Sequence, residues 1–294
     1  MRATLRFFVD ADKLMQSITH LSNEWRSWIA QNLARGCDPQ TLVADMIRSH
    51  FDPEFAFSAV MGSSAATATH CVEEYSYEQP RLATGNVLVA DGRAMRVLLR
   101  VERPQVAFIE NILDADECDE LVRRSTSNLT RSTTVDPESG AGAIIANRSS
   151  EGTYFPIEAD PFIARLDRRI AALMNAPVEN GEGLQILHYH TGGEYTPHFD
   201  YFPPADPGSA AHIANGGQRI ASLIMYLNDV AAGGSTVFPE LKLTVGPKKG
   251  AGVYFEYCNS RGQVDPLTLH GGLPVIEGEK WIATKWVRQR RYGS

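Results

Sequence analysis

The sequence lacks the cysteine patterns of metal-bound and disulfide-linked proteins. Its 294 residues include four cysteines, none in a CxxC pair: Cys37, Cys71, Cys118 and Cys258. A zinc ribbon needs closely spaced cysteine pairs, and a disulfide framework needs a higher cysteine density. We therefore expect reduced and mostly buried thiols.

Long apolar runs and long basic runs are also missing. No segment reaches the roughly 18 consecutive apolar residues that a transmembrane helix needs. Residues 1–15 meet Asp10 and Asp12 before any long apolar run, so a secretory leader is not expected. The formal net charge of -7 argues against nucleic acid or an anionic membrane as the main partner. Together these absences predict a cytoplasmic protein.

The remaining composition is that of an ordinary globular protein, long enough for one large domain and a small one. Residues 1–62 are predicted to form a small α-helical module. Ser22, Asp38 and Asp52 each stand where a helix can begin, and apolar residues follow at helical spacing. Such a module can dock to a protein, mediate self-association or simply extend the structure.

Residues 63–104 are predicted to be a linker that contains a β-hairpin. The small and polar residues of segment 62–68 are typical of a linker. Asp91-Gly92 then separates two strand-like segments, which is a strong hairpin signal.

Residues 105–294 are predicted to form a mainly β domain with flanking helices. Helices are expected after Asp114 and Asp160, whose side chains can cap them. Strand-like segments between turns rich in glycine and proline follow at residues 184–189, 219–227, 252–257 and 280–288. This order fits an antiparallel jelly roll, or double-stranded β-helix, with helices packed outside it. Residues 203–217 look too irregular for a regular element and are expected to form a lid.

Two histidines and one aspartate suggest a metal centre. Alternate side chains of a β-strand share a face, so His198 and Asp200 can reach one point, while His270 would arrive from a distant strand. Three such ligands on one face of Fe(II) leave three positions open, whereas a structural zinc site closes four. A histidine and an aspartate in an exposed turn would have the same spacing, so the neighbouring residues must decide.

The neighbouring residues closely resemble the prolyl 4-hydroxylase branch of the Fe(II)/2-oxoglutarate oxygenases. The resemblance runs in order through residues 105–294 and is carried by these segments: 189–202 (YHTGGEYTPHFDYF), 217–221 (GQRIA), 225–229 (MYLND), 233–239 (GGSTVFP), 270–275 (HGGLPV) and 278–286 (GEKWIATKW). It implies a jelly-roll dioxygenase that uses Fe(II), 2-oxoglutarate and O2, with ascorbate to restore oxidised iron.

The resemblance assigns roles to the central residues. It implies that His198, Asp200 and His270 bind Fe(II). Lys280 would bind the distal carboxylate of 2-oxoglutarate through charge-assisted hydrogen bonds. The alternative is a solvent-facing lysine. Strand alternation places Lys280 and Trp286 on one face of the last strand and Lys285 on the other.

Further residues match family positions around the co-substrate and the peptide. Tyr189 and Thr236 would contact 2-oxoglutarate, although threonine is also an ordinary strand residue. The residues that would contact the peptide substrate are Arg148, Ser150, Glu182, Tyr195, Arg219 and Trp286. An alternative for Arg219 and Glu182 is a simple surface ion pair.

Arg288 departs from the family pattern. The family strand often carries a histidine at this place, where it can contact substrate. A permanent cation stands there in this chain, which affects the expected substrate specificity and leaves the iron site unaffected.

A cupin-like site is a competing prediction. Gly183, His188, His190 and Glu194 resemble part of a cupin signature, in which the two histidines and the glutamate bind metal. The two predictions exclude each other, because Tyr189 and its neighbouring histidines point to opposite faces of a strand.

The predicted function is Fe(II)- and 2-oxoglutarate-dependent hydroxylation of prolyl residues at the 4-position in a peptide or protein. One alternative is hydroxylation of a free amino acid or another small molecule. A less expected alternative is a cupin-like protein that binds metal or 2-oxoglutarate without turnover. The expected partner is a proline-containing peptide or protein, with neither nucleic acid nor membrane involved.

Overall fold

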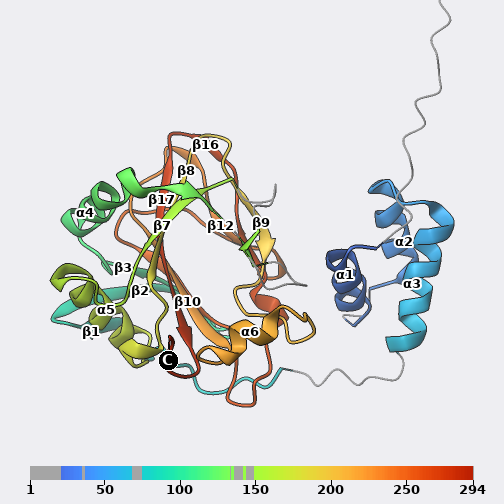
Figure 1. Ribbon diagram of the computed structural model, residues 1–294, viewed down its shortest axis with the longest axis horizontal. Coiled ribbons are helices and arrows are strands. Elements are labelled where there is room, and N and C mark those ends of the chain that lie inside the picture. Colours follow the sequence, from blue (N-terminus) through green and yellow to red (C-terminus); the bar gives the residue numbers. More distant parts are fainter. Residues whose placement is uncertain are drawn as a thin grey trace, which may run out of the picture. The chain divides into compact units, whose positions relative to one another are not determined.

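The structure is a computed structural model that describes residues 21–34, 37–67, 75–132, 134–135, 142–143 and 149–293 (Figure 1). It divides into two compact units, Met1–Glu74 and Tyr75–Ser294. No helix in these described ranges is long and apolar enough to span a membrane. Three of the four cysteines lie in these ranges as free thiols, and Cys118 and Cys258 are buried as expected; Cys71 falls outside them.

Within residues 21–34 and 37–67, the first unit forms three helices, as predicted: α1 (Asn23–Ala34), α2 (Pro39–Arg48) and α3 (Pro53–Thr67). The Asp38 side chain caps α2 by accepting a hydrogen bond from the Thr41 amide. The buried core of this unit comprises Ile29, Leu42, Met46, Phe51, Ala56 and Val60. The expected linker at 62–68 was wrong for most of its length, because α3 continues to Thr67. Serine and alanine propagate a helix adequately when no proline interrupts it.

A nine-stranded antiparallel sheet forms the frame of the second unit. Its spatial order is β1 (Val87–Ala90), β2 (Arg93–Val101), β3 (Val106–Glu110), β14 (Gly252–Glu256), β10 (Arg219–Tyr226), β17 (Lys280–Arg288), β8 (Leu184–Tyr189), β7 (Glu151–Phe155) and β4 (Thr130–Arg131). The hairpin around Asp91-Gly92 is present, but β1 and β2 form an edge of this sheet. The hairpin therefore belongs to the same unit as residues 105–294 rather than to a linker.

A smaller sheet lies opposite the large one, with the order β13 (Leu243–Val245), β12 (Thr236–Phe238), β15 (His270–Gly272) and β9 (Tyr195–His198) (Figure 1). Two short pairs accompany it: β11 (Ala232–Gly233) with β16 (Val275–Glu277), and β5 (Thr134–Val135) with β6 (Gly142–Ala143). The Tyr226 hydroxyl of β10 bonds to Thr236 of β12, which shows that the two sheets face each other. The expected jelly roll is confirmed.

Two helices cover the outer face of the large sheet (Figure 1). They are α4 (Ala115–Ser125), which begins with a capping box of Asp114 and Glu117, and α5 (Pro161–Leu173), which Asp160 caps. An ion pair of 2.7 Å between Asp167 of α5 and Lys285 of β17 joins helix and sheet. Both expected helix starts are confirmed.

Short helical segments also occur in the described loops: Thr126–Asn128, Val178–Asn180, Pro239–Leu241, Pro266–Thr268 and α6 (Ser209–Ala214). The last of these corrects the expectation that residues 203–217 hold no regular element. The segment Ser209–Ala214 contains neither proline nor glycine, so one helical turn can form inside an otherwise irregular segment.

Candidate active site

The two sheets bring His198, Asp200 and His270 together. His198 ends β9 and pairs in register with His270, which begins β15. The Nε2 atom of His198 lies 3.7 Å from Oδ1 of Asp200, and the Nε2 atom of His270 lies 3.6 Å from Oδ2. One ligand atom from each residue falls within 4.8 Å of the others. Three donors at this separation can share one metal ion.

Backbone carbonyls orient both imidazole rings. The Nδ1 atom of His198 lies 2.9 Å from the Thr196 carbonyl, and Nδ1 of His270 lies 3.0 Å from the Thr268 carbonyl. A carbonyl only accepts, so Nδ1 carries the proton in each ring and Nε2 keeps its lone pair. Metal-binding histidines are oriented in this manner. The rings therefore fit the role of metal ligands.

Asp200 is fixed by a network that the sequence did not indicate. The Ser222 hydroxyl donates to Oδ2 of Asp200 at 2.5 Å and lies 3.0 Å from the Tyr257 hydroxyl. Burial alone would raise the pKa of Asp200, but the electrostatic surroundings formed by His270, His198 and Arg219, together with the Ser222 hydrogen bond, hold this pKa below its usual value. The carboxylate is therefore ionised and oriented before any ligand binds.

Aromatic rings pack around the histidines. Tyr195 stacks on His198 with centroids 3.6 Å apart, while Phe255 meets His270 edge to face at 4.6 Å. These contacts restrict the two imidazoles to the orientations that the carbonyls favour. Tyr195, expected to contact peptide, thus also lies beside a predicted iron ligand.

Lys280 is a buried cation without an ionic partner. It is 4 % exposed, which excludes the solvent-facing alternative. Its Nζ lies 5.6 Å from the ring centroid of Tyr189, its register partner, and 5.9 Å from that of Tyr226. Among the residues that the structure describes, no carboxylate lies within ion-pair distance of this amine. Burial consequently lowers the pKa of Lys280 to about 8.

Glycines leave space beside the lysine. A Cβ atom added at Gly272 would lie 3.6 Å from Nζ, and one at Gly234 would lie 3.4 Å from the Lys280 side chain. An anion entering this space would supply the missing counter-charge. A carboxylate group of 2-oxoglutarate would be such an anion, and the roles expected of Lys280 and Tyr189 stay predictions.

Thr236 faces the same interior and is 3 % exposed. Its Oγ1 accepts a hydrogen bond of 2.7 Å from the Tyr226 hydroxyl, so its own proton can be donated to another group. The expected contact with 2-oxoglutarate stays a prediction.

Arg219, Glu182 and Arg288 form a buried cluster, so the simple surface pair considered for the first two is wrong. Arg219 makes two hydrogen bonds to Glu182, at 2.6 and 2.8 Å, and a third of 3.1 Å to the Asp200 carbonyl. Burial would raise the pKa of Glu182, but the two guanidinium groups hold it below its usual value. The cluster thereby links residues predicted to contact peptide to the backbone of Asp200, a predicted iron ligand.

Arg288 is 2 % exposed and fully engaged. It donates to Glu182 at 2.6 Å and to the carbonyls of His212 and Gly217 at 3.0 and 2.8 Å. The arginine that departs from the family pattern therefore ties α6 and its flanking loop to β17. Its side chain anchors the predicted lid instead of offering a free charge to substrate.

Trp286 lies beside this cluster, with the Arg219 guanidinium 4.0 Å from the ring centroid. Its Nε1–H is buried and has no hydrogen-bond partner among the described residues. Ser150 is fully buried and bonds to the Ser132 hydroxyl at 3.0 Å, whereas Arg148 lies outside the described residues. Of the predicted peptide contacts, Trp286 offers a donor that a peptide carbonyl could use.

The cupin-like alternative fails on strand alternation. Tyr189 pairs with Lys280 on the interior face, and His188 pairs with Trp281 on the outer face. His188 stacks on Trp281 with centroids 4.0 Å apart. The histidines of residues 188–190 therefore do not reach the barrel interior.

Comparison with known proteins identifies the family. Residues 184–288 match the model of the 2OG-Fe(II) oxygenase superfamily. The chain is 38% identical over 208 residues to the probable prolyl 4-hydroxylase 10 of Arabidopsis thaliana, covering 64% of this chain and 70% of that one. It is 37% identical over 202 residues to prolyl 4-hydroxylase 5 of the same plant, covering 62% and 68%.

A solved structure agrees with these matches. The viral collagen prolyl hydroxylase of Paramecium Bursaria Chlorella virus-1, in its 2OG complex, superposes with a TM-score of 0.50 and 29% identity, covering 62% of this chain and 95% of that one. The chain belongs to the prolyl 4-hydroxylases of the 2OG-Fe(II) oxygenase superfamily.

Proposed function

We propose that this protein hydroxylates prolyl residues at the 4-position in a peptide or protein, with Fe(II), 2-oxoglutarate and O2. The observation that carries this proposal is the combination of the three oriented metal donors with a buried, unpaired lysine. The donors suit a metal with open positions, and the lysine suits an anionic co-substrate. The family relatives named above supply the substrate class.

Different residues would bind the metal ion and the co-substrate. His198, Asp200 and His270 would hold Fe(II), which supplies the oxidising chemistry with O2. Lys280 would bind the distal carboxylate of 2-oxoglutarate, and Tyr189 and Thr236 would orient the same molecule. Burial of this pocket excludes bulk water and strengthens the interaction between lysine and carboxylate.

Trp286 and Arg219 would position the substrate. The Trp286 ring offers an aromatic face to a proline ring, and its unpaired Nε1–H can donate to a peptide carbonyl. Arg219 is already bonded to Glu182 and to the Asp200 carbonyl, so it would act by keeping this wall of the site in place.

Mass spectrometry of a proline-containing peptide library, incubated with the protein, Fe(II) and 2-oxoglutarate, tests the function. We expect one added oxygen atom on proline, and loss of this product in the His198→Ala and His270→Ala variants. Free proline and other free amino acids are assayed in parallel. Modification of a free amino acid without any modified peptide would replace this proposal by the small-molecule alternative.

A further inference from the structure

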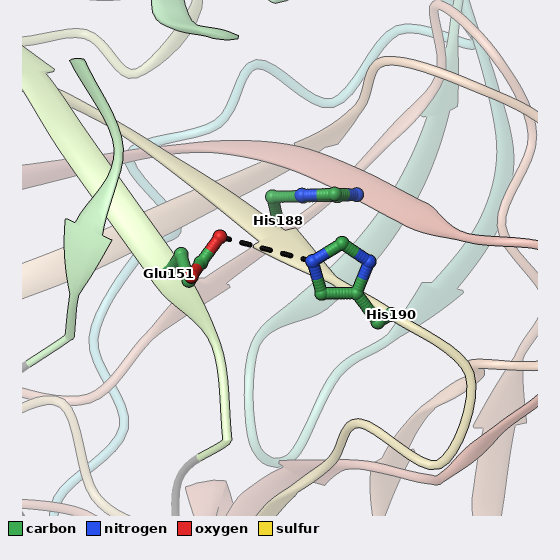
Figure 2. A group of neighbouring side chains, drawn as sticks. All are labelled: Glu151, His188 and His190. Atoms are coloured by element: carbon green, nitrogen blue, oxygen red, sulfur yellow. Dashed lines mark ion pairs between the residues drawn. The ribbon is translucent and has the colours of Figure 1, made fainter. Parts of the chain in front are cut away.

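A second group of metal-type ligands lies on the outer face of the large sheet. Glu151, His188 and His190 each offer one ligand atom within 4.8 Å of the others. Glu151 of β7 pairs in register with His188 of β8, and His190 follows two residues later. Figure 2 shows the three side chains gathered on one side of these strands. Because alternate residues of a strand share a face, His188 and His190 lie on the outer face and Tyr189, between them, lies on the opposite face.

His188 has the orientation of a metal ligand. Its Nε2 lies 2.7 Å from the Glu279 carboxylate, and its Nδ1 is buried with no hydrogen-bond partner among the described residues. A carboxylate only accepts, so Nε2 carries a proton, and Nδ1 is the nitrogen that can offer a lone pair to a metal ion. A buried acceptor without a partner is unfavourable. The stacked Trp281 ring keeps His188, which is only 5 % exposed, in this position.

The other two side chains are accessible from solvent. The side chains of His190 and Glu151 are 68 % and 44 % exposed, and Nε2 of His190 lies 3.7 Å from Oε2 of Glu151. Arg131 stands opposite Glu151 in β4 and is the neighbouring cation; it donates to the Ser149 carbonyl at 3.4 Å. The cluster therefore combines one fixed, buried nitrogen with two exposed groups that can adjust around an ion.

We propose that Glu151, His188 and His190 form a second divalent-cation site, which takes Zn²⁺. Two imidazoles and one carboxylate are a common zinc ligand set and leave the fourth tetrahedral position for water. Glu279 acts as the carboxylate that orients the His188 ring. The set also binds Zn²⁺ in preference to Fe²⁺ on general affinity grounds.

The site would connect strands that carry the co-substrate pocket. His188 and His190 flank Tyr189, and Glu279 precedes Lys280. A bound ion would join β7 to β8 and, through Glu279, to the start of β17. Because the ion binds only the folded chain, it would raise the melting temperature as its concentration increases.

Competition with a chromophoric zinc chelator, using the full-length protein, tests the proposal. We expect two tightly bound equivalents of Zn²⁺ in the wild type, since the inner triad also accepts this ion. His198→Ala should keep one equivalent, and His190→Ala or Glu151→Gln should remove the other. Glu279→Gln should weaken the outer site about 10- to 100-fold, because it only orients a ligand.

Folding controls keep the result interpretable. His190 and Glu151 are largely exposed, so their variants avoid the disturbance that loss of the buried His188 ring would cause. His50→Asn removes an exposed histidine from the other unit and should retain both equivalents; asparagine tolerates the positive φ of 68° found there.

In a His198→Ala background, Zn²⁺ should raise the melting temperature, and added His190→Ala should abolish this rise. A single equivalent in the wild type that His198→Ala eliminates, or two equivalents retained in His190→Ala, would overturn the proposal.

Discussion

Lys280 and Lys285 lie on the same strand, β17, in opposite environments. Both are buried, at 4 % and 2 % exposure. Lys285 meets Asp167 at 2.7 Å on the outer face, whereas Lys280 faces the interior and has no ionic partner within the described part of the chain. A buried charge that lacks a partner is costly unless a ligand supplies one. This contrast favours Lys280 over Lys285 as the predicted ligand of an anion.

Replacing Lys280 by alanine is expected to raise the KM for 2-oxoglutarate while iron still binds. The lost charge-assisted contact contributes roughly 1.5 to 3 kcal/mol, equivalent to about a 10- to 150-fold change. Steady-state kinetics with varied 2-oxoglutarate measure it. Lys285→Ala is the control variant. It should lower the melting temperature, because it leaves the buried Asp167 without its lysine partner, and it should leave the KM of the folded protein unchanged. An unchanged KM in Lys280→Ala would show that another residue binds the co-substrate.

The affinity for 2-oxoglutarate is expected to fall at high pH. The pKa of Lys280 in the free protein is about 8, and only the protonated amine attracts the carboxylate. Above this pH the dissociation constant should rise by up to about tenfold per pH unit, because binding must then take up a proton. Isothermal titration between about pH 7 and pH 10 measures it. Lys280→Arg stays charged over this range and should show a weak pH dependence. Equal slopes for wild type and variant would contradict the assignment.

Ser222 is expected to support iron binding without touching the ion. Its 2.5 Å hydrogen bond to Asp200 fixes the carboxylate, and loss of such a bond typically weakens metal affinity about 10- to 100-fold. Ser222→Ala should therefore need more Fe(II) for half-maximal activity. Ser125→Ala removes an equally buried hydroxyl, bonded at 2.7 Å to the Leu121 carbonyl, and should leave the iron requirement unchanged. Identical iron requirements in wild type and Ser222→Ala would refute this role.

At the scale of elements, α4 and α5 are joined by a buried ion pair. Arg169 of α5 makes hydrogen bonds of 2.7 and 2.9 Å to Glu117 of α4, and a further one of 3.2 Å to the Ile112 carbonyl. Burial would raise the pKa of Glu117, but Arg169 holds it below its usual value of 4.5. The pair therefore stabilises the fold above about pH 4.5, and this contribution is lost as the pH falls through the lowered pKa.

Glu117→Ala is expected to lower the free energy of unfolding by about 3 to 5 kcal/mol, because it leaves the buried Arg169 with only a longer ion pair, of 3.8 Å to Asp91. Chemical denaturation at neutral pH measures the change. Asp116→Ala alters the neighbouring exposed carboxylate and should stay within about 0.5 kcal/mol of wild type. A similarly small effect in Glu117→Ala would mean that water replaces the carboxylate.

Sequence patterns predicted the long elements well and the short ones poorly. Residues 184–189 and 280–288 coincide with β8 and β17, because a strand-like run of six or more residues bounded by turns is a strong signal. The smaller sheet consists of strands of three or four residues, too short for such a signal, yet it carries both iron-site histidines.

Side-chain partners across the fold were harder to predict than the elements. The spacing of His198 and Asp200 and the family resemblance predicted a site that the structure assembles. Nothing in the local sequence indicates that Arg288 pairs with Glu182, 106 positions away. Ser222 could have been noticed in the sequence, since it is the one serine among the mostly apolar residues of β10.

At the scale of the whole molecule, the chain consists of two units with separate cores. The buried residues of the first unit form one cluster, and those of the second unit form another. All residues of the predicted iron and 2-oxoglutarate site belong to the second unit. The first unit exposes Phe57 and Ile47, at 54 % and 41 %, which suits a proposed role in docking or self-association.

A truncated chain that begins at Tyr75 is therefore expected to fold and to act on a short peptide at close to the full-length rate. The buried core of α1 to α3 and the Asp38 cap of α2 consist of residues of the first unit alone. Circular dichroism and peptide kinetics measure folding and catalysis, and light scattering at matched concentrations measures self-association. Full-length chain carrying Phe57→Ser is the control for docking, since it alters the exposed surface while retaining the helices. The truncated chain could instead be insoluble or lose most of its activity toward the short peptide. Either result would make the helical unit a structural part of the catalytic domain, because a unit that only docks partners cannot affect a substrate too small to reach it.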